Sequence, residues 1–424
     1  MKIYIILLAL IISISDINSL NKRGEKSDYD LLYEWGKNHS LFISNKIEMN
    51  YTNENDKNFF VKKKIKKNET IMTIPKAILL NVESALNILG KKVRKQYENY
   101  KKQQFNSKNY ANDEILSYRI DQSFLAYLMT IANKSKKNKL YQYYQYFFKT
   151  FETNLERFPV FFNSEQLRLL MFSLFGNEVI QTKEMFEEEF EILQKQISKK
   201  TLDQDEYIKY RIFTFNKFVN ISGTSYIIPF VDMLETNPIS YNLQINYTLQ
   251  NDYSITIISI KDIKPEDKLK MAVVQMTNSG SLITYGKIYE ENKHYVENFR
   301  IPKISTNFLR ERNIDPLMAS GEIVDLSQKN YYEEIIPVYT QLSKMLKEDG
   351  SKASALRLFL ENIKSIRNAY NKLTVSELFK NFFITKNVQN IRSILDTEKY
   401  YLDKKIKEMK IILNKYVRER ENDL

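Results

Sequence analysis

The apolar positions of the chain change their spacing several times. Residues 29–39 (YDLLYEWGKNH) carry apolar side chains three and four positions apart, which predicts an amphipathic helix. Residues 57–63 (KNFFVKK) and 69–81 (ETIMTIPKAILLN) have shorter apolar runs, which predict two strands with a turn between them. Helical spacing then returns between about residues 82 and 211, as in SFLAYLMTIAN and NSEQLRLLMFSLF.

The second half of the chain repeats this alternation. Between residues 226 and 282, the runs YIIPFVDML, YSITIISI and KLKMAVVQM predict short strands. After residue 301 the segments YYEEIIPVYTQLSKML and KASALRLFLENIKSIRNAY and residues 392–420 predict helices nearly to the end. The last segment has coiled-coil features, but it follows other amphipathic helices and we interpret it as part of a bundle. The predicted order is strands, a helical insert, strands and a helical tail.

Composition and charge narrow the class of partner. With 424 residues, 43% of them hydrophobic and 13% aromatic, the chain is predicted to be globular. Its net charge of +12 is compatible with an acidic partner, but the lysines are spread along the sequence. The densest run, VKKKIKK at 61–67, has the spacing of a strand with one solvated face, and the aromatic run at 141–148 is typical of a packed helix face. We therefore predict no nucleic-acid partner.

The N-terminal residues resemble a secretory signal peptide. Lys2 precedes an apolar run at 3–12, and the small residues Ser13, Ser15 and Ser19 follow it. We predict a signal peptide over residues 1–19, with a signal anchor as the alternative. No later segment reaches eighteen apolar residues, so no stable membrane span is expected after cleavage. The predicted location is the secretory pathway: the endoplasmic reticulum lumen, a secretory organelle or the extracellular space.

Several kinds of chemistry are excluded by residue counts. The chain has no cysteine, so it forms no disulfide and carries out no thiol chemistry. Its two histidines, His39 and His294, are too few for a metal site with three histidine ligands, and we predict no metal.

Four short stretches follow one another in an informative order. They are IMTIP at 71–75, IFTFNKF at 212–218, IIPFVDMLETNP at 227–238 and KPEDKLKMAVVQMTNSGSLITYGK at 264–287. Together with the order of predicted elements, they resemble the SET-domain methyltransferases of the Rubisco large-subunit and actin-histidine type. The resemblance covers about residues 29–418.

The resemblance implies a fold class and a division into domains. The fold is α+β, with a split SET-like β-fold that encloses a helical insert and is followed by an all-helical C-terminal lobe. We expect the signal peptide at 1–19, the SET-like domain at 29–300 with its insert at about 83–211, and a helical substrate-binding-like domain at 301–424. In this family the substrate is a protein, so a protein partner or protein substrate is expected.

The expected cofactor side of the site departs from the family pattern. Asn68–Pro75 corresponds to the signature Gly-Glu, any residue, two apolar residues, any residue, Ile-Pro. The family's upstream Gly-x-Gly is Asp56-Lys57-Asn58 here, so side chains intrude where the resemblance places Asn58 and Phe59 at the cofactor. The family's carboxylate-binding arginine is Asn216, which keeps polarity and loses the charge.

The expected substrate side departs in the same way. In the third stretch Asp232 matches the family and is expected in the substrate pocket, whereas the family's Asn-His pair is Glu235-Thr236. We therefore interpret Asp232 and Glu235 as separate residues and not as an acid/base pair. The family's catalytic tyrosine aligns with Val273, which has no hydroxyl group, and Tyr285 is the remaining candidate.

Each retained residue also has a purely structural interpretation. Asp232 and Asn278 could serve only in turns, and Tyr285-Gly286 could be the end of a strand. Trp35, the single tryptophan, is expected in the core.

Three functions follow from these departures. The first is a pseudo-methyltransferase that needs no cofactor and acts by binding a protein. The second is an active protein-lysine or protein-histidine N-methyltransferase that uses S-adenosylmethionine. The third is a helical scaffold with no relation to SET domains.

Overall fold

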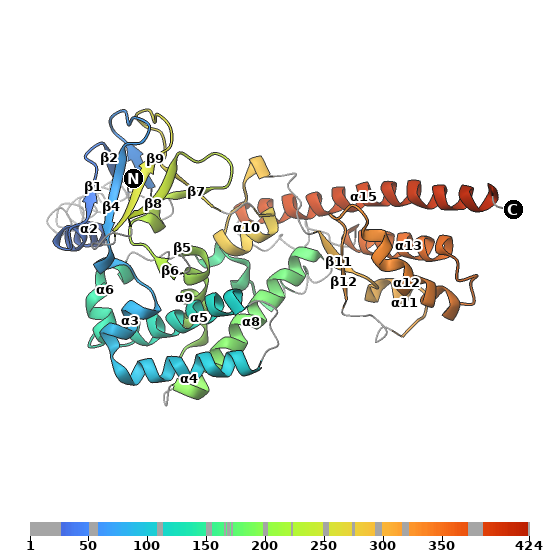
Figure 1. Cartoon of the computed structure of the whole chain (residues 1–424), viewed down its shortest axis with the longest axis horizontal. Coiled ribbons are helices and arrows are strands. Elements are labelled where there is room, and N and C mark those ends of the chain that lie inside the picture. Colours follow the sequence, from blue (N-terminus) through green and yellow to red (C-terminus); the bar gives the residue numbers. More distant parts are fainter. Residues whose placement is uncertain are drawn as a thin grey trace, which may run out of the picture. The chain divides into compact units, whose positions relative to one another are not determined.

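The structure, a computed structural model, consists of two compact units (Figure 1). It describes residues 27–50, 58–107, 113–149, 155–164, 167, 170, 173–197, 202–221, 224–248, 254–273, 276–292, 299–315, 322–371 and 385–422. The first unit comprises Met1–Thr153, Gln196–Thr236 and Tyr241–Met271, and the second comprises Asn154–Lys195, Asn237–Ser240 and Ala272–Leu424. This division differs from the expected boundary at residue 300, and the expected domain limits stay a prediction. The predicted signal peptide lies outside the described residues.

The first unit is built on a six-stranded sheet with the order β1-β4-β9-β8-β10-β7. These strands are β1 (Phe42–Ile43), β4 (Thr70–Pro75), β7 (Glu235–Asn237), β8 (Leu243–Thr248), β9 (Ser254–Ser259) and β10 (Lys270–Ala272). Two strand pairs accompany it: β2 (Ile47–Asn50) with β3 (Asn58–Val61), and β5 (Phe218–Ile221) with β6 (Thr224–Ile227). Strand β9 alternates buried and half-buried residues, as the pattern SITIIS predicts for a strand with one face in the core.

The helices of this unit follow the predicted amphipathic segments. They are α2 (Asp28–Asn38), α3 (Val82–Leu89), α4 (Lys91–Ser107), α5 (Asp113–Asn133), α6 (Lys139–Lys149) and α9 (Gln204–Lys217), with the short 3-10 helices η2 (Lys76–Ile78) and η5 (Val231–Met233). Trp35 of α2 lies in the core, as predicted, against the ring of Tyr144. Tyr144 also donates a 3.0 Å hydrogen bond to the carbonyl of Leu79. The aromatic run of α6 is therefore a packed helix face, as expected.

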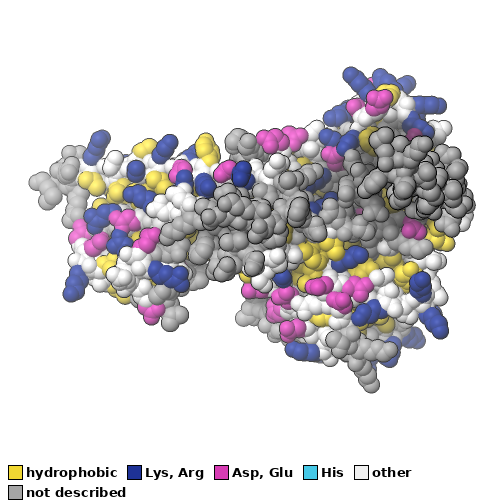
Figure 2. Space-filling view, turned by 180° about the vertical axis from the view of Figure 1, so that it is seen from behind, with side chains coloured by type: hydrophobic (Ala, Val, Ile, Leu, Met, Phe, Trp, Pro, Cys, Tyr) yellow, Lys and Arg dark blue, Asp and Glu magenta, His cyan; other side chains and the backbone are white. Residues whose placement is uncertain are grey.

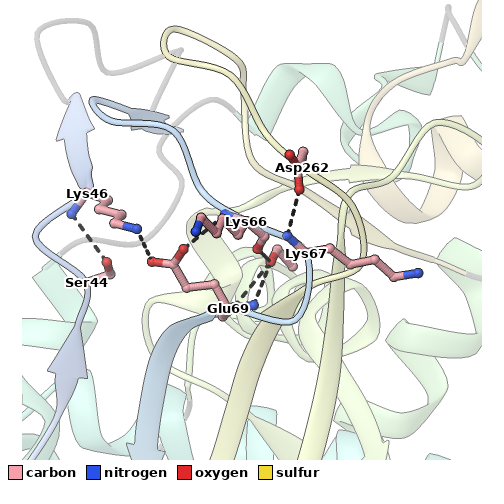
Figure 3. Close-up of polar contacts among 7 residues, drawn as sticks. Ser44, Lys46, Lys66, Lys67, Glu69 and Asp262 are labelled. Atoms are coloured by element: carbon pink, nitrogen blue, oxygen red, sulfur yellow. Dashed lines mark hydrogen bonds and ion pairs between the residues drawn. The ribbon is translucent and has the colours of Figure 1, made fainter.

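The predicted turn between β3 and β4 depends on one backbone position. Asn68, at the position where the resemblance predicts a glycine, has a φ of 64° in the left-handed region. Asparagine tolerates this conformation better than most residues with a side chain. Glu69 and Ser259 then fix the turn: the Glu69 amide donates to the Ser259 hydroxyl at 3.0 Å, and that hydroxyl donates to the carbonyl of Lys66 at 2.5 Å (Figure 3).

Three expected strands are shorter than their apolar runs. The strand expected over 226–234 ends at Ile227, because Pro229 has no N–H to donate and Phe230 adopts a φ of 73°. The strand expected over 61–67 ends at Val61, and beyond it Ile65 forms an isolated bridge with Ile263. In the run 268–276, strand structure covers Lys270–Ala272.

The second unit is largely helical, with one small sheet that the sequence pattern missed. Its elements are η3 (Leu155–Arg157), η4 (Pro159–Phe161), α8 (Leu174–Ile197) as far as Lys195, α10 (Asn278–Tyr285), η6 (Glu290–Asn292), β11 (Arg300–Pro302), α11 (Thr306–Glu311), β12 (Ile323–Asp325), α12 (Tyr331–Met345), α13 (Lys352–Asn371) and α15 (Thr385–Asn422). Of the expected helix at 163–175, residues 164, 167 and 170 are helical and α8 begins at Leu174. Among the described residues, no helix is both long and apolar enough to cross a membrane.

The antiparallel pair β11–β12 shows why the expectation of an all-helical tail was incomplete. Each strand has three residues, which is too short for an alternating pattern to show in the sequence. The pair is held from α13 by Asn362, whose amide donates to the carbonyl of Lys303 at 3.0 Å and accepts from the amide of Ser305 at 3.0 Å.

A buried carboxylate joins three helices of the second unit. Glu398 of α15 accepts hydrogen bonds from the Phe175 amide at 3.0 Å and from the Tyr370 hydroxyl at 2.7 Å. Tyr370 in turn accepts a 3.1 Å bond from the Leu174 amide, so both groups satisfy donors at the start of α8. Burial, together with the nearby charge of Glu178, raises the pKa of Glu398 to about 8. The hydrogen bonds from Tyr370 and the two amides oppose this shift.

This carboxylate predicts a pH dependence of stability. Because the pKa of Glu398 is raised in the folded state above its ordinary value of 4.5, the folded chain holds a proton that the unfolded chain has released. Its contribution to the free energy of unfolding is complete below pH 4.5 and is lost as the pH rises through about 8, with a slope of at most about 1.4 kcal/mol per pH unit.

Calorimetric melting temperatures between pH 5 and pH 8 measure this effect in the wild type and in Glu398→Gln. The amide keeps an acceptor for the Phe175 amide and does not titrate, so the variant is expected to show a flatter profile. Asp396→Asn, an exposed substitution on the same helix, is the matched control. Equal slopes in all three proteins would contradict the assignment to Glu398.

Candidate functional site

Strand β3 carries the first two expected cofactor positions. Asn58 is the first residue of the strand, and its backbone pairs with that of Asn50. The side chain of Asn58 and the whole of Asp56 and Lys57 lie outside the described part of the chain. Phe59 is 2% exposed, and its carbonyl accepts a 3.3 Å hydrogen bond from the amide of Leu269. The ring of Phe59 therefore belongs to the core, and its backbone attaches β3 to the segment that leads into β10.

Glu235 of β7 lies against two cations from that same segment. Its carboxylate is 3.8 Å from the ammonium of Lys268 and 3.9 Å from that of Lys270. Successive side chains of an extended segment point to opposite faces, so the two lysines share one face and the buried Leu269 occupies the other. The Glu235 side chain is 25% exposed, so solvent screens both pairs and each contributes little stability. Glu235, at the position where the resemblance predicts an Asn-His pair, thus belongs to an ionic cluster.

Helix α9 brings Asn216 and Lys217 to its C-terminal end. Asn216 is half-buried, and its side-chain oxygen is buried without a hydrogen-bond donor among the described residues. Lys217 donates from its ammonium group to the carbonyl of Asp232 at 2.6 Å. A cation in the last turn is also favoured by the helix dipole. The positive charge near the expected arginine position therefore belongs to the next residue, where it holds the η5 turn.

Asp232 lies in the middle of the η5 turn. Its amide donates to the carbonyl of Ile228 at 3.3 Å, and the amide of Leu234 donates to the carbonyl of Val231 at 3.0 Å. Asp232 and the neighbouring Thr236 of β7 are both half-buried. The carboxylate of Glu235 is engaged by lysines, whereas Asp232 is held through its backbone carbonyl. That these two carboxylates do not act as an acid/base pair stays a prediction.

The remaining expected positions belong to the second unit. Val273 follows β10 and is half-buried. Tyr285 is the last residue of α10 and is half-buried, and Gly286 ends that helix with a φ of 64°. The alternative that Tyr285-Gly286 ends a strand is therefore wrong. Asn278 is the first residue of α10, and its buried amide exchanges hydrogen bonds of 3.1 and 3.2 Å with the backbone of Tyr289, which is a structural role.

Sequence reasoning missed the lysines that organise this region. Lys217, Lys268 and Lys270 each contact an expected site residue or its backbone. The alternation Lys-Leu-Lys at 268–270 was a usable signal, because it places two cations on one face of an extended segment. The described residues contain no cluster of three or more His, Asp or Glu side chains that could hold a metal ion.

Comparison with known proteins finds similarity in structure alone. No protein-family model matches the sequence, and no curated protein matches it. The SET domain of LSMT bound to lysine and AdoHcy matches with a TM-score of 0.62 and 12% identity, covering 92% of this chain and 92% of that chain. Rubisco LSMT bound to sinefungin and monomethyllysine matches with a TM-score of 0.63 and 11% identity, covering 92% of this chain and 94% of the other.

A third solved structure agrees with these two. Rubisco LSMT bound to AdoMet matches with a TM-score of 0.63 and 10% identity, over 92% of this chain and 94% of that one. At such low identity the likeness concerns the fold. The match spans both the strand-rich part and the helical C-terminal region. This chain therefore has the α+β fold of the SET-domain methyltransferase Rubisco LSMT, including a helical C-terminal region.

Proposed function

We propose that this chain is a SET-fold protein of the secretory pathway that has lost methyl transfer and acts by binding another protein. The observation that carries the proposal is the ionic cluster of Glu235, Lys268 and Lys270 at the position of the family's Asn-His pair. A neutral amide and imidazole can both donate to a bound cofactor, whereas a carboxylate only accepts. The residues present therefore do not fit S-adenosylmethionine in the manner the resemblance implies.

The other substitutions support the same conclusion. Methyl transfer needs a held cofactor and an in-line nucleophile, and loss of positioning alone costs several orders of magnitude in rate. Asn216 offers no charge to a carboxylate, and Val273 offers no hydroxyl group. Phe59 is buried in the core. Because these changes concern separate contacts to one expected ligand, a single compensating residue would not restore them all.

The outer face of α15 supports a protein-binding role. Tyr400 and Ile411 are large apolar residues with exposed fractions of 64% and 71%. Lys404 and Lys407 lie between them in the sequence and are also exposed. The spacing of four, three and four residues places these side chains along one stripe of the helix. We call these four residues the α15 stripe, and its chemistry suits a partner with apolar and acidic side chains.

The secretory location rests on the N-terminal sequence pattern. Lys2, the apolar run at 3–12 and Ser19 have the order that a signal peptidase recognises. Mass spectrometry of the protein from its native cells is expected to find an N-terminus at Leu20. Recovery of intact Met1 would contradict cleavage and favour the signal anchor.

The alternative function is an active SET-type protein N-methyltransferase that uses S-adenosylmethionine. Its support is the fold, since the similar Rubisco LSMT structures contain AdoMet, AdoHcy or lysine. In that case Tyr285, half-buried at the end of α10, is the remaining tyrosine candidate for the catalytic hydroxyl.

Calorimetric titration of residues 20–424 with S-adenosylmethionine and S-adenosylhomocysteine separates the two functions. We expect no binding tighter than about 1 mM, equivalent to about 4 kcal/mol, because the contacts at Asn216 and Glu235 are lost. A triple variant, Asn216→Arg with Glu235→Asn and Thr236→His, restores the family residues and is expected to gain measurable binding. Thermal melting checks that both proteins are folded.

Micromolar binding by the wild type would overturn the loss of the cofactor site. Transfer of a labelled methyl group to a protein from the native cells, with loss of transfer in Tyr285→Phe, would then establish the alternative function.

The α15 stripe provides a separate test of protein binding. Purification of the tagged chain from native cells is expected to recover a partner with the wild type. The double variant Tyr400→Ala with Ile411→Ala is expected to lose it, because an exposed apolar contact pair is removed. Phe42→Ala with Ile239→Ala, two exposed apolar residues elsewhere, is the matched control. Equal recovery by all three proteins would exclude this stripe as the binding surface.

A further inference from the structure

Two loops at one end of the first unit carry concentrated positive charge. Residues 62–68 follow β3 and residues 261–268 follow β9, and together they hold eight lysines and only three acidic residues. We call these two loops the basic tip. It lies at the upper right of Figure 2, where dark-blue side chains gather. Its net charge of five is a large share of the chain's total of +12.

The backbone of the basic tip is fixed from within. Ile65 and Ile263 exchange two hydrogen bonds of 3.0 Å and are both buried, which joins the two loops. The amide of Lys67 donates to the carboxylate of Asp262 at 3.0 Å (Figure 3), and that of Lys264 donates to Asp267 at 3.0 Å. The acidic residues Asp262 and Asp267 therefore serve the loop backbone, and the lysine side chains project from a rigid support.

Four lysines of the basic tip have neither an ion pair nor a longer-range acidic partner among the described residues. Lys62 pairs with Glu48 at 2.9 Å, and Lys64 pairs with Asp262 at 2.8 Å. The Lys66 ammonium acts at longer range on the carboxylates of Glu69 and Asp262, and contributes to their lowered pKa values. The exposed lysines whose ammonium groups have no such acidic partner are Lys63, Lys67, Lys261 and Lys264. Within the described part of the chain, these four lysines form a cationic surface without acidic counter-charges.

The residue types of the tip favour one class of anionic partner. The two loops contain no arginine and no aromatic residue, so they lack the guanidinium forks that read base edges and the rings that stack on bases. The loop amides of Lys67 and Lys264 are already bonded, so they cannot capture the backbone of an acidic peptide. A lysine ammonium group acts as a point charge, so several exposed lysines on neighbouring loops suit a partner whose negative charge is spread over a wide surface.

We propose that the basic tip is a peripheral docking surface for an anionic phospholipid bilayer. Each lysine close to such a surface strengthens binding roughly fivefold, and the attraction falls off within a Debye length of about 10 Å at 0.1 M salt. The buried Ile65 and Ile263 leave no apolar anchor in the two loops, so the attachment is electrostatic and reversible by salt. The basic tip shares Lys268 with the Glu235 cluster, but its four lysines without an acidic partner lie outside the expected cofactor positions. The proposal rests neither on the loss of methyl transfer nor on the proposed secretory location.

Sedimentation of the whole chain with lipid vesicles tests the proposal. We expect binding to vesicles of phosphatidylcholine with about one-third phosphatidylserine at about 0.1 M salt, and none to pure phosphatidylcholine. Replacing the four lysines that have no acidic partner with glutamine is expected to weaken binding to the anionic vesicles at least tenfold. This tip variant is Lys63→Gln, Lys67→Gln, Lys261→Gln and Lys264→Gln.

A control variant with the same net charge separates the tip from the overall charge. It replaces four exposed lysines of α4 with glutamine: Lys91, Lys92, Lys95 and Lys102. This variant is expected to keep vesicle binding close to wild type, and melting temperatures verify that both variants are folded. Equal loss in the two variants, or no binding to anionic vesicles, would overturn the proposal. So would tip-dependent binding to a duplex oligonucleotide by a chain that does not bind vesicles.

Discussion

The pairing of β4 with β9 is the constraint on which the first unit depends. It joins segments about 190 residues apart, as the hydrogen bond from the Glu69 amide to Ser259 illustrates. Closing such a long loop costs conformational entropy, which the ladder and the buried face of β9 must offset. Once the pair has formed, the helical insert begins and ends near one sheet, and β8 and β10 are added on the far side of β9. The order of the sheet therefore positions the expected cofactor residues Glu235 and Thr236 on its edge strand β7.

The same sheet can support a protein whose expected site has changed. Asn68 adopts the left-handed conformation at a turn where the resemblance predicts a glycine. Where the resemblance predicts an amide and an imidazole at the cofactor, the chain has Glu235 and Thr236. The charge of Glu235 is met by Lys268 and Lys270, and Lys217 holds the backbone carbonyl of Asp232. Fold and chemistry are thus separable, because the sheet is stabilised by its core and the site by a few side chains.

Much of the fold could be predicted because its elements are long and periodic. Helices such as α2 and α13 and the alternating strand β9 agree with their apolar spacing, because burial of one face imposes a fixed period. The short strands β11 and β12 could not be found in this way, since three residues do not establish a period. The overlong strand expected at 226–234 failed because the left-handed φ of Phe230 is imposed by tertiary packing and not by its residue type.

The sequence by itself determined the SET-like order of elements, and it predicted the site positions, among them Asn216 and Val273, which offer no charge and no hydroxyl group. These features depend on local periodicity and residue identity. Tertiary structure decided which lysines engage Glu235, how Glu398 is buried beneath the start of α8, and that two separate lysine-rich loops form one basic tip. Such relationships join residues distant in sequence, and only the pairing of strands and helices brings their charges within a few ångströms of each other.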